Sequence, residues 1–232
     1  LLFGMSHLTL IYKLRNTMKK LLSLLSIISL LTIVSAKADF GIGVSGAMHF
    51  IDGSGTETTR TSSEKNNGSH DELATVPEVF VEALLDNGGA LGLSYIPTRD
   101  MGSKSRSDSN SDGDTGTYTA KAELDNVIKV YTDIPTGASF YGDIYMHLGI
   151  QHVTVTTLES LNSGETYPNK DLYGYTIGVG TKGDLPYGNN LYYKSEITYT
   201  NFETYKANGT AGNKVEADLE DLAARISVGY KF

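Results

Sequence analysis

The last stretch of the chain, Leu219–Phe232, reads L-E-D-L-A-A-R-I-S-V-G-Y-K-F. From Leu222 onward every second residue is apolar, and the residues between them are small or charged. Because successive side chains of a strand point to opposite faces, this stretch predicts a strand with one apolar and one polar face. A strand of a membrane-spanning barrel has this alternation, with its apolar row toward lipid and its polar row toward the interior.

The end of this strand resembles the C-terminal signature of bacterial outer-membrane barrels. The matching residues are Val228, Tyr230 and the terminal Phe232. The resemblance implies that the barrel assembly machinery of a Gram-negative bacterium reads these three positions as an assembly signal. The alternative is an ordinary terminal strand of a soluble sheet, and these few residues do not separate the two readings.

The beginning of the chain has the features of a cleaved secretory signal peptide. Met18-Lys19-Lys20 precedes an apolar run from Leu21 to Val34, and Ala36-Lys37-Ala38 supplies the small residues that signal peptidase needs. The run is too short for a membrane-spanning helix, which needs roughly 20 residues. We expect residues 1–17 to be an upstream extension, residues 18–38 to be the signal peptide and residues 39–232 to form an outer-membrane β-barrel domain.

Composition and charge limit the classes of protein that this chain can belong to. The chain has no cysteine, so disulfide bonds cannot stabilise it. Five of the 19 basic residues precede residue 39, and all 27 acidic residues lie in residues 39–232, so that part carries a formal charge of −13. This excess of negative charge argues against a nucleic-acid partner and makes cations more plausible partners of the surface than anions.

The apolar–polar alternation recurs along the chain and predicts eight strands. They cover residues 40–51, 73–85, 90–98, 117–130, 139–157, 172–181, 190–202 and 219–232. Short turns at residues 86–89, 133–138 and 182–189 alternate with long polar loops at residues 52–72, 99–116, 158–170 and 203–218. The pattern blurs at residues 126–130, where we expect a β-bulge.

We therefore predict an all-β fold, an eight-stranded antiparallel up-and-down transmembrane β-barrel with four long extracellular loops. In this arrangement the chain resembles the small OmpA-type, OmpX-type and opacity-type barrels. The rival interpretation is a soluble eight-stranded barrel of lipocalin type, which would bury its apolar face. The resemblance implies a location in the outer membrane and lipid as the surrounding partner.

Charged residues on the predicted inward rows are the first candidates for a functional site, because ionisable groups inside a membrane protein are commonly functional. They are Glu78, Glu82, Lys121, Glu123, Asp125, Asp143, Lys194, Glu196 and Arg225. His49 and His147 lie on inward rows as well. A barrel of eight strands has room for little beyond its own side chains, so these charges predict either an ion-paired plug or a narrow path for ions.

Two further patterns suggest chemistry only weakly. Ser69-His70-Asp71 could belong to a lipid-modifying enzyme, although three such residues occur easily by chance in a polar segment. Asp108, Asn110, Asp112 and Asp114 match the first half of a calcium-binding loop, but Thr119 stands where the last ligand should be a glutamate. We expect a non-enzymatic protein without a cofactor, whose loops interact with an extracellular ligand or with divalent cations; the alternative is a narrow channel for small solutes or ions.

Overall fold

The computed structural model describes residues 38–60, 63–108, 116–159, 165–186 and 190–232. These residues form ten strands, β1 (Asp39–Thr58), β2 (Lys65–Leu84), β3 (Ala90–Ile96), β4 (Arg99–Asp108), β5 (Gly116–Ser139), β6 (Asp143–Thr157), β7 (Lys170–Asp184), β8 (Leu191–Phe202), β9 (Tyr205–Asn208) and β10 (Lys214–Lys231). No helix among them is long and apolar enough to span a membrane. The predicted upstream extension and, apart from Ala38, the predicted signal peptide lie outside the described residues and stay predictions.

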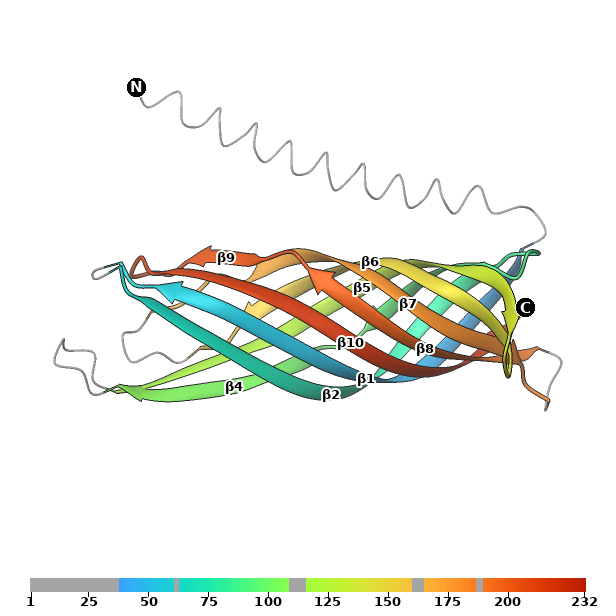
Figure 1. Ribbon diagram of the computed structural model, residues 1–232, viewed down its shortest axis with the longest axis horizontal. Coiled ribbons are helices and arrows are strands. Elements are labelled where there is room, and N and C mark those ends of the chain that lie inside the picture. The colour runs from blue at the N-terminus through green and yellow to red at the C-terminus, as the bar shows by residue number, and fades with distance from the viewer. Residues whose placement is uncertain (1–37, 61–62, 109–115, 160–164, 187–189) are drawn as a thin grey trace, which may run out of the picture. The chain divides into compact units, whose positions relative to one another are not determined.

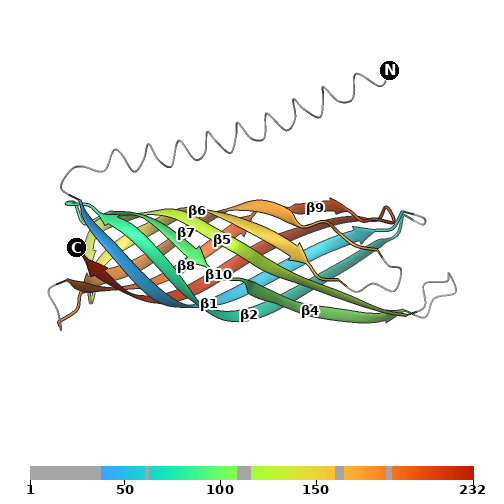
Figure 2. The same cartoon turned by 180° about the vertical axis from the view of Figure 1, so that it is seen from behind.

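The strands form one closed antiparallel ring (Figures 1 and 2). β1 pairs with β10 along its length, from Gly41 opposite Lys231 to Thr58 opposite Lys214, and this pairing closes the sheet. β4 continues the line of β3 along β5, while β9 pairs with the outer end of β10 beyond the end of β8, so the ring has eight strand positions. The predicted eight-stranded antiparallel barrel is thereby confirmed. A closed ring leaves few backbone groups unpaired, which is what a sheet needs in order to cross hydrocarbon.

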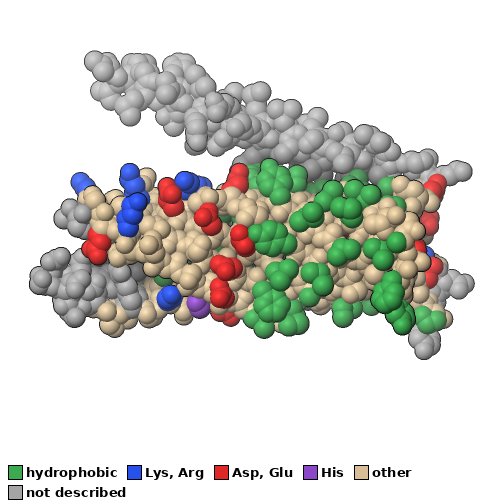
Figure 3. All heavy atoms as spheres, in the orientation of Figure 1, with side chains coloured by type: hydrophobic (Ala, Val, Ile, Leu, Met, Phe, Trp, Pro, Cys, Tyr) green, Lys and Arg blue, Asp and Glu red, His purple; other side chains and the backbone are tan. Residues whose placement is uncertain are grey.

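Apolar side chains gather on the outside of one part of the barrel, as the face in Figure 3 shows, and strands all around the ring carry exposed apolar residues; we call this the apolar band. On β10, Ile226 is 70% exposed, and the neighbouring Leu222, Val228 and Tyr230 lie on the same outer face. On β1 the band runs from Phe40 to Phe50. A soluble barrel of lipocalin type would bury these side chains, so the outward apolar face excludes that rival and identifies the band as the membrane-spanning part.

Three of the four segments predicted as long polar loops contain strand, which corrects that prediction, whereas residues 158–159 and 165–169 of the remaining segment form no strand. β1 continues to Thr58 and β2 begins at Lys65, so residues 59–64 alone connect them. Within the other predicted loops, residues 99–108 form β4, residues 205–208 form β9, and β10 begins at Lys214. Together these strand ends carry the barrel beyond the apolar band. We call the described residues 52–60, 63–72, 99–108, 116–124, 153–159, 165–172 and 203–220 the outer extension. Pairing satisfies the backbone hydrogen bonds of these strands even where both faces are polar.

Two local predictions for β5 and its surroundings have different outcomes. The expected irregularity at residues 126–130 is present as a register shift between Asp125 and Ile128, with Asn126 at a φ of 52°. The predicted turn at residues 133–138 is wrong, because β5 continues to Ser139 and the chain reverses at Phe140–Gly142 instead. The ladder partner of Pro135 is Tyr145, so a proline marks the last part of the strand and not the turn.

The interior of the barrel has two zones that differ in polarity. Inside the apolar band the buried side chains are mostly charged or polar. Beyond it, toward the outer extension, they form an apolar cluster of Ile51, Ile96, Leu124, Val127, Val153, Val155, Leu172, Phe202, Tyr205 and Leu219. The sequence alternation does not predict this second zone, because it assigns polar residues to the whole inner face. The apolar cluster separates the charged interior from the outer end of the barrel.

The wall of the outer extension contains one seam. β2 pairs with β3 from Val79 to Leu84, and β3 ends at Ile96. Beyond that point β4 pairs with β5, and among the described residues no ladder joins β4 to the outer half of β2. Side-chain contacts bridge the two strands instead, as where the Lys104 ammonium donates to the Ser69 carbonyl at 2.8 Å.

Candidate functional site: the ionic interior

The inner face of the membrane-spanning part brings charged side chains together because the facing positions are small. Glu82 lies in register with Gly41 on one neighbouring strand and with Gly92 on the other. Gly92 is in turn in register with Tyr131 of β5, whose ring occupies the space where a Cβ at Gly92 would lie. Because Gly41 and Gly92 have no side chain, the Tyr131 ring and the Glu82 side chain can occupy the space above them.

The buried charged side chains of the membrane-spanning part form one connected group, which we call the ionic cluster. The end of this cluster that lies away from the outer extension, its inner end, is built around Lys194 of β8. Its ammonium donates to a Glu82 carboxylate oxygen at 3.0 Å and to Asp133 Oδ2 at 2.7 Å. Tyr192 and Tyr131 each donate a hydroxyl hydrogen to Glu82, both at 2.8 Å. Glu82, Asp133 and Lys194 are at most 3% exposed, so every charge here is buried and paired.

The outer end of the cluster is built around Arg225 of β10 and His49 of β1. Arg225 donates to Glu78 through Nε at 2.7 Å and through a terminal nitrogen at 3.0 Å, which makes a bidentate pair. His49 lies between two carboxylates, with Nε2 at 3.1 Å from Glu78 and Nδ1 at 2.9 Å from Asp221. Arg99, from the start of β4, donates to the same Asp221 at 2.7 Å.

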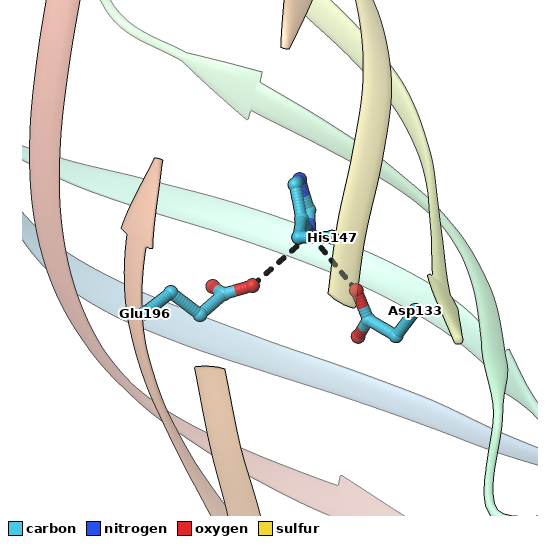
Figure 4. Close-up of side chains that lie close together, drawn as sticks. All are labelled: Asp133, His147 and Glu196. Atoms are coloured by element: carbon cyan, nitrogen blue, oxygen red, sulfur yellow. Dashed lines mark hydrogen bonds and ion pairs between the residues drawn. The ribbon is translucent and has the colours of Figure 1, made fainter. Parts of the chain in front are cut away.

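His147 of β6 lies between these two ends (Figure 4). Its Nδ1 is 2.8 Å from Asp133 Oδ1 and 3.1 Å from Glu196 Oε1. Arg225 approaches the other oxygen of Glu196 at 3.4 Å, so Glu196 connects His147 with the outer end. Contacts of acid with base therefore run without a break from Tyr192 to Arg99 through the membrane-spanning part of the barrel.

The charges of this cluster nearly cancel. Its buried acids are Glu78, Glu82, Asp133, Glu196 and Asp221, and its permanent cations are Arg99, Lys129, Lys194 and Arg225. With both histidines neutral the sum is therefore −1, and one proton or cation more would raise it to zero or above. Buried charges are tolerated when they are paired and hydrogen-bonded. This holds for most of the cluster, and the Lys129 ammonium lies 5.6 Å from the centre of the Tyr131 ring.

Little free space remains between these side chains. The cavity among Glu78, Lys129, His147, Glu196 and Arg225 has a volume of about 10 Å³. A water molecule needs at least roughly 10–15 Å³ by this measure, so the cavity holds one water at most. The interior is thus filled by its own side chains, and the apolar cluster of the outer extension lies beyond it.

The candidate residues from the sequence fall into two groups. Glu78, Glu82, Lys194, Glu196 and Arg225 lie buried in the ionic interior. Lys121, Glu123, Asp125 and Asp143 do not, which corrects their assignment. The bulge at Asn126 turns the first three outward, so that Leu124 points inward and Lys121 pairs with Asp100 at 3.0 Å on the outside. Asp143 lies exposed at the first residue of β6.

Sequence reasoning also missed members of the cluster. Arg99 and Asp133 fell within segments predicted as a loop and a turn, and Lys129 fell in the irregular part of β5. Asp221 alternates with Ala223 and Arg225 on the polar row of β10, so the pattern of that strand could have found it. In the calcium-like segment, Asn110, Asp112 and Asp114 lie outside the described residues, and Asp108 is the last residue of β4.

Outside the membrane-spanning part, acidic side chains form a row where the apolar band ends. Asp52 of β1 is in register with Asp71 of β2 and with Glu220 of β10. Desolvation and the negative charges of Asp71 and Glu220 raise the pKa of Asp52. Ser69 and Asp71 point to the opposite face of β2 from His70, because a strand alternates, so these three residues do not converge as an enzyme site would require.

No protein-family model matches the chain, and no curated protein matches it by sequence. Among solved structures it is similar to the outer membrane protein AlkL in lipid bilayers, with a TM-score of 0.46 and 9% identity over 84% of this chain and 90% of that one. The outer membrane protein OprG from Pseudomonas aeruginosa gives a TM-score of 0.45 and 13% identity over 84% and 97% of the two chains. Neisserial surface protein A gives 0.37 and 11% over 83% and 97%.

The closed ring, the outward apolar band and the paired charges inside it are the features that define the molecule. Hydrocarbon can surround the band, and the interior keeps its charges away from lipid. The chain is an eight-stranded antiparallel β-barrel whose apolar outer band suits a membrane.

Proposed function

We propose that this protein is a closed barrel that serves a structural or surface-interaction role through its outer extension. The observation that carries the proposal is the tightly packed interior, where the cavity bordered by Glu78, His147 and Arg225 measures about 10 Å³. A hydrated ion or small solute needs a continuous path several times wider. The apolar cluster beyond the charged zone adds a second barrier, because desolvating an ion there is costly.

The outer extension is the part of the barrel that such a role would use. It stands clear of the apolar band and carries charged side chains on its outer surface (Figure 3). The row of Asp52, Asp71 and Glu220 makes its base acidic. Such a surface favours polar or cationic ligands over anionic ones, and most of the described extension consists of paired strands.

Two further partners belong to the same proposal. Outer-membrane lipid surrounds the apolar band, in which Ile226 and Phe232 are about 70% exposed. The barrel assembly machinery engages the end of β10, where Val228, Tyr230 and Phe232 all lie on the outer face. In this reading the signal peptide at residues 18–38 directs export and β1 begins at Asp39, directly after the expected cleavage site.

Single-channel recording tests the proposal against its alternative, a narrow channel. The protein, expressed with its complete N-terminal segment and purified from membranes, is inserted into planar bilayers under an applied voltage. We expect an inserted barrel without discrete current steps, because the interior offers no continuous path. Steady, reproducible openings of the folded protein would overturn the closed-barrel proposal and favour the channel.

The control is a variant whose interior is hollowed while its lipid-facing surface is unchanged. Replacing Arg225 and Glu78 together by alanine removes both partners of one bidentate ion pair. Neither of these two charges then remains in the interior without the other. If this variant conducts while the parent protein stays silent, the recording detects open barrels and the silence of the parent is meaningful.

A further inference from the structure

The two buried histidines of the interior are used in different ways. His49 faces Glu78 with Nε2 at 3.1 Å, while its Nδ1 lies 2.9 Å from Asp221 and 2.6 Å from the Arg99 guanidinium, which can donate to it. His147 instead presents the single atom Nδ1 to both Asp133 and Glu196. The His49 arrangement can therefore be satisfied by hydrogen atoms alone, whereas the His147 arrangement cannot.

One hydrogen on Nδ1 cannot serve two oxygens fully. The hydrogen bond goes to Asp133 Oδ1 at 2.8 Å. Glu196 Oε1, 3.1 Å from the same nitrogen, is buried without a hydrogen-bond partner among the described residues, and so is His147 Nε2. A buried carboxylate oxygen without a hydrogen-bond donor is costly. A positive centre bound by Asp133 Oδ1, His147 Nδ1 and Glu196 Oε1 together would satisfy all three atoms.

The three atoms form a set of metal-ligand type. Asp133 Oδ1, His147 Nδ1 and one oxygen of Glu196 come from β5, β6 and β8 and all lie within 4.8 Å of one another. Figure 4 shows both carboxylates directed at the imidazole from opposite sides. An ion about 2.0–2.2 Å from each of four tetrahedral ligands needs the carboxylate oxygens to move slightly away from Nδ1, from 2.8 and 3.1 Å, which rotation of the long Glu196 side chain allows.

Neighbouring side chains orient these three ligands, as hydrogen-bonding groups around metal ligands do in known metal sites. Lys194 binds the second oxygen of Asp133, and Arg225 approaches the second oxygen of Glu196, so each carboxylate keeps one oxygen for the ion. Tyr131 stacks on the imidazole, with ring centroids 4.9 Å apart, and fixes its plane. The adjoining cavity of about 10 Å³ borders His147 and Glu196 and leaves room for one water as a fourth ligand.

We propose that Asp133, His147 and Glu196 form a site for a divalent transition-metal ion of the Zn²⁺ class inside the barrel. One imidazole nitrogen and two carboxylate oxygens suit Zn²⁺ and Co²⁺, which accept four ligands of this kind. The ion binds Nδ1 while the imidazole proton moves to Nε2, so the ring stays neutral. It changes the charge of the ionic cluster from −1 to +1, the same magnitude, so the permanent cations Lys129, Lys194 and Arg225 do not forbid it.

The site is buried, so loading is tested both during folding and afterwards. The full chain is refolded in detergent with one equivalent of Co²⁺, or refolded first and then given the ion. The readouts are the visible absorption of four-coordinate Co²⁺ and the metal content after desalting. We expect about one ion per barrel when the ion is present during refolding, and its displacement by Zn²⁺.

Matched variants decide whether the ion occupies this site. Glu196→Gln and His147→Asn should each weaken Co²⁺ binding at least tenfold, since each removes one ligand and keeps the side chain's approximate size. His49→Asn, at the histidine that already uses both nitrogens, should bind like the parent protein. Folding of each barrel is checked by its shifted migration on unheated gels.

Two results would overturn the proposal. One is the absence of tightly held metal in the folded parent protein under both loading protocols. The other is equal binding by the parent and His147→Asn, because the ion would then lie elsewhere, for instance at the exposed acidic row. A barrel that binds the ion and still conducts current would contradict the proposed closed-barrel function alone, so the two ideas fail separately.

Discussion

Arg225 illustrates how single residues stabilise the interior. Its guanidinium binds Glu78 through two nitrogens and reaches Glu196 with a third contact. Each of these acids is at most 5% exposed and therefore has lost its water. An arginine suits this position because its fork of donors matches a carboxylate, which a lysine cannot do.

Replacing Arg225 by methionine should lower the free energy of unfolding by ~3–5 kcal/mol, because Glu78 is then buried as an uncompensated charge. Urea unfolding of the lipid-refolded barrel, followed by circular dichroism, measures the change. Lys121→Met is the control, since Lys121 pairs with Asp100 on the exposed outer face and such pairs contribute little. Equal decreases in the free energy of unfolding of the two variants would show that the buried pair contributes no more to stability than the exposed pair.

At the scale of elements, the alternation of residues predicts the membrane-spanning strands well and the outer extension poorly. On β10 the apolar row from Leu222 to Phe232 lies on the outer face along its whole length. Hydrocarbon demands an apolar face, so that part of the sequence carries a strong signal. In the outer extension the outer face of the barrel is in contact with water, so its side chains need not be apolar. Strands and loops there have similar polar sequences and cannot be told apart by alternation.

The bulge in β5 explains the largest error among the candidate site residues. Its extra residue, Asn126, shifts the register, so residues before and after it use opposite parities. Lys121, Glu123 and Asp125 therefore face outward, while Lys129 and Asp133 face inward. The sequence indicates where the irregularity lies, but a shift of one residue reverses every assignment on one side of it.

The seam between β2 and β4 predicts uneven protection of backbone amides. Residues 65–71 of β2 pair with β1 on one side, whereas residues 53–58 of β1 pair with strands on both sides at the same height. Hydrogen exchange measured by nuclear magnetic resonance in micelles should therefore be faster for alternate amides of residues 65–71 than for residues 53–58. Uniform protection of both segments would mean that β2 and β4 are joined by a ladder.

At the scale of the whole molecule, the barrel has two ends of different construction. At one end the strands are joined by tight reversals such as residues 85–89. At the other end the paired strands of the outer extension rise beyond the apolar band. Short connections on the periplasmic side and longer ones outside are the rule for bacterial barrels, so we predict that the outer extension of this molecule faces outward.

The absence of cysteine makes this orientation simple to test. Single cysteines are introduced at Thr117, in the outer extension, and at Asp86, in the tight reversal, both of which are exposed. A membrane-impermeant maleimide should label the Thr117→Cys protein on intact cells and the Asp86→Cys protein only after the outer membrane is broken. The reverse order of labelling would invert the barrel.

The one-to-one pairing of β1 with both neighbours as far as Thr58 also bears on how such a protein can diverge over generations. A single inserted codon in this region adds one residue to the strand. Between the insertion and the hairpin tip, side chains that pointed inward then point outward, and the reverse. A pair of inserted codons, matched by a pair in the adjoining strand, keeps both faces and merely makes the hairpin taller. Descendants of this gene should therefore differ in height by even steps, while the part that sits in lipid keeps a constant length.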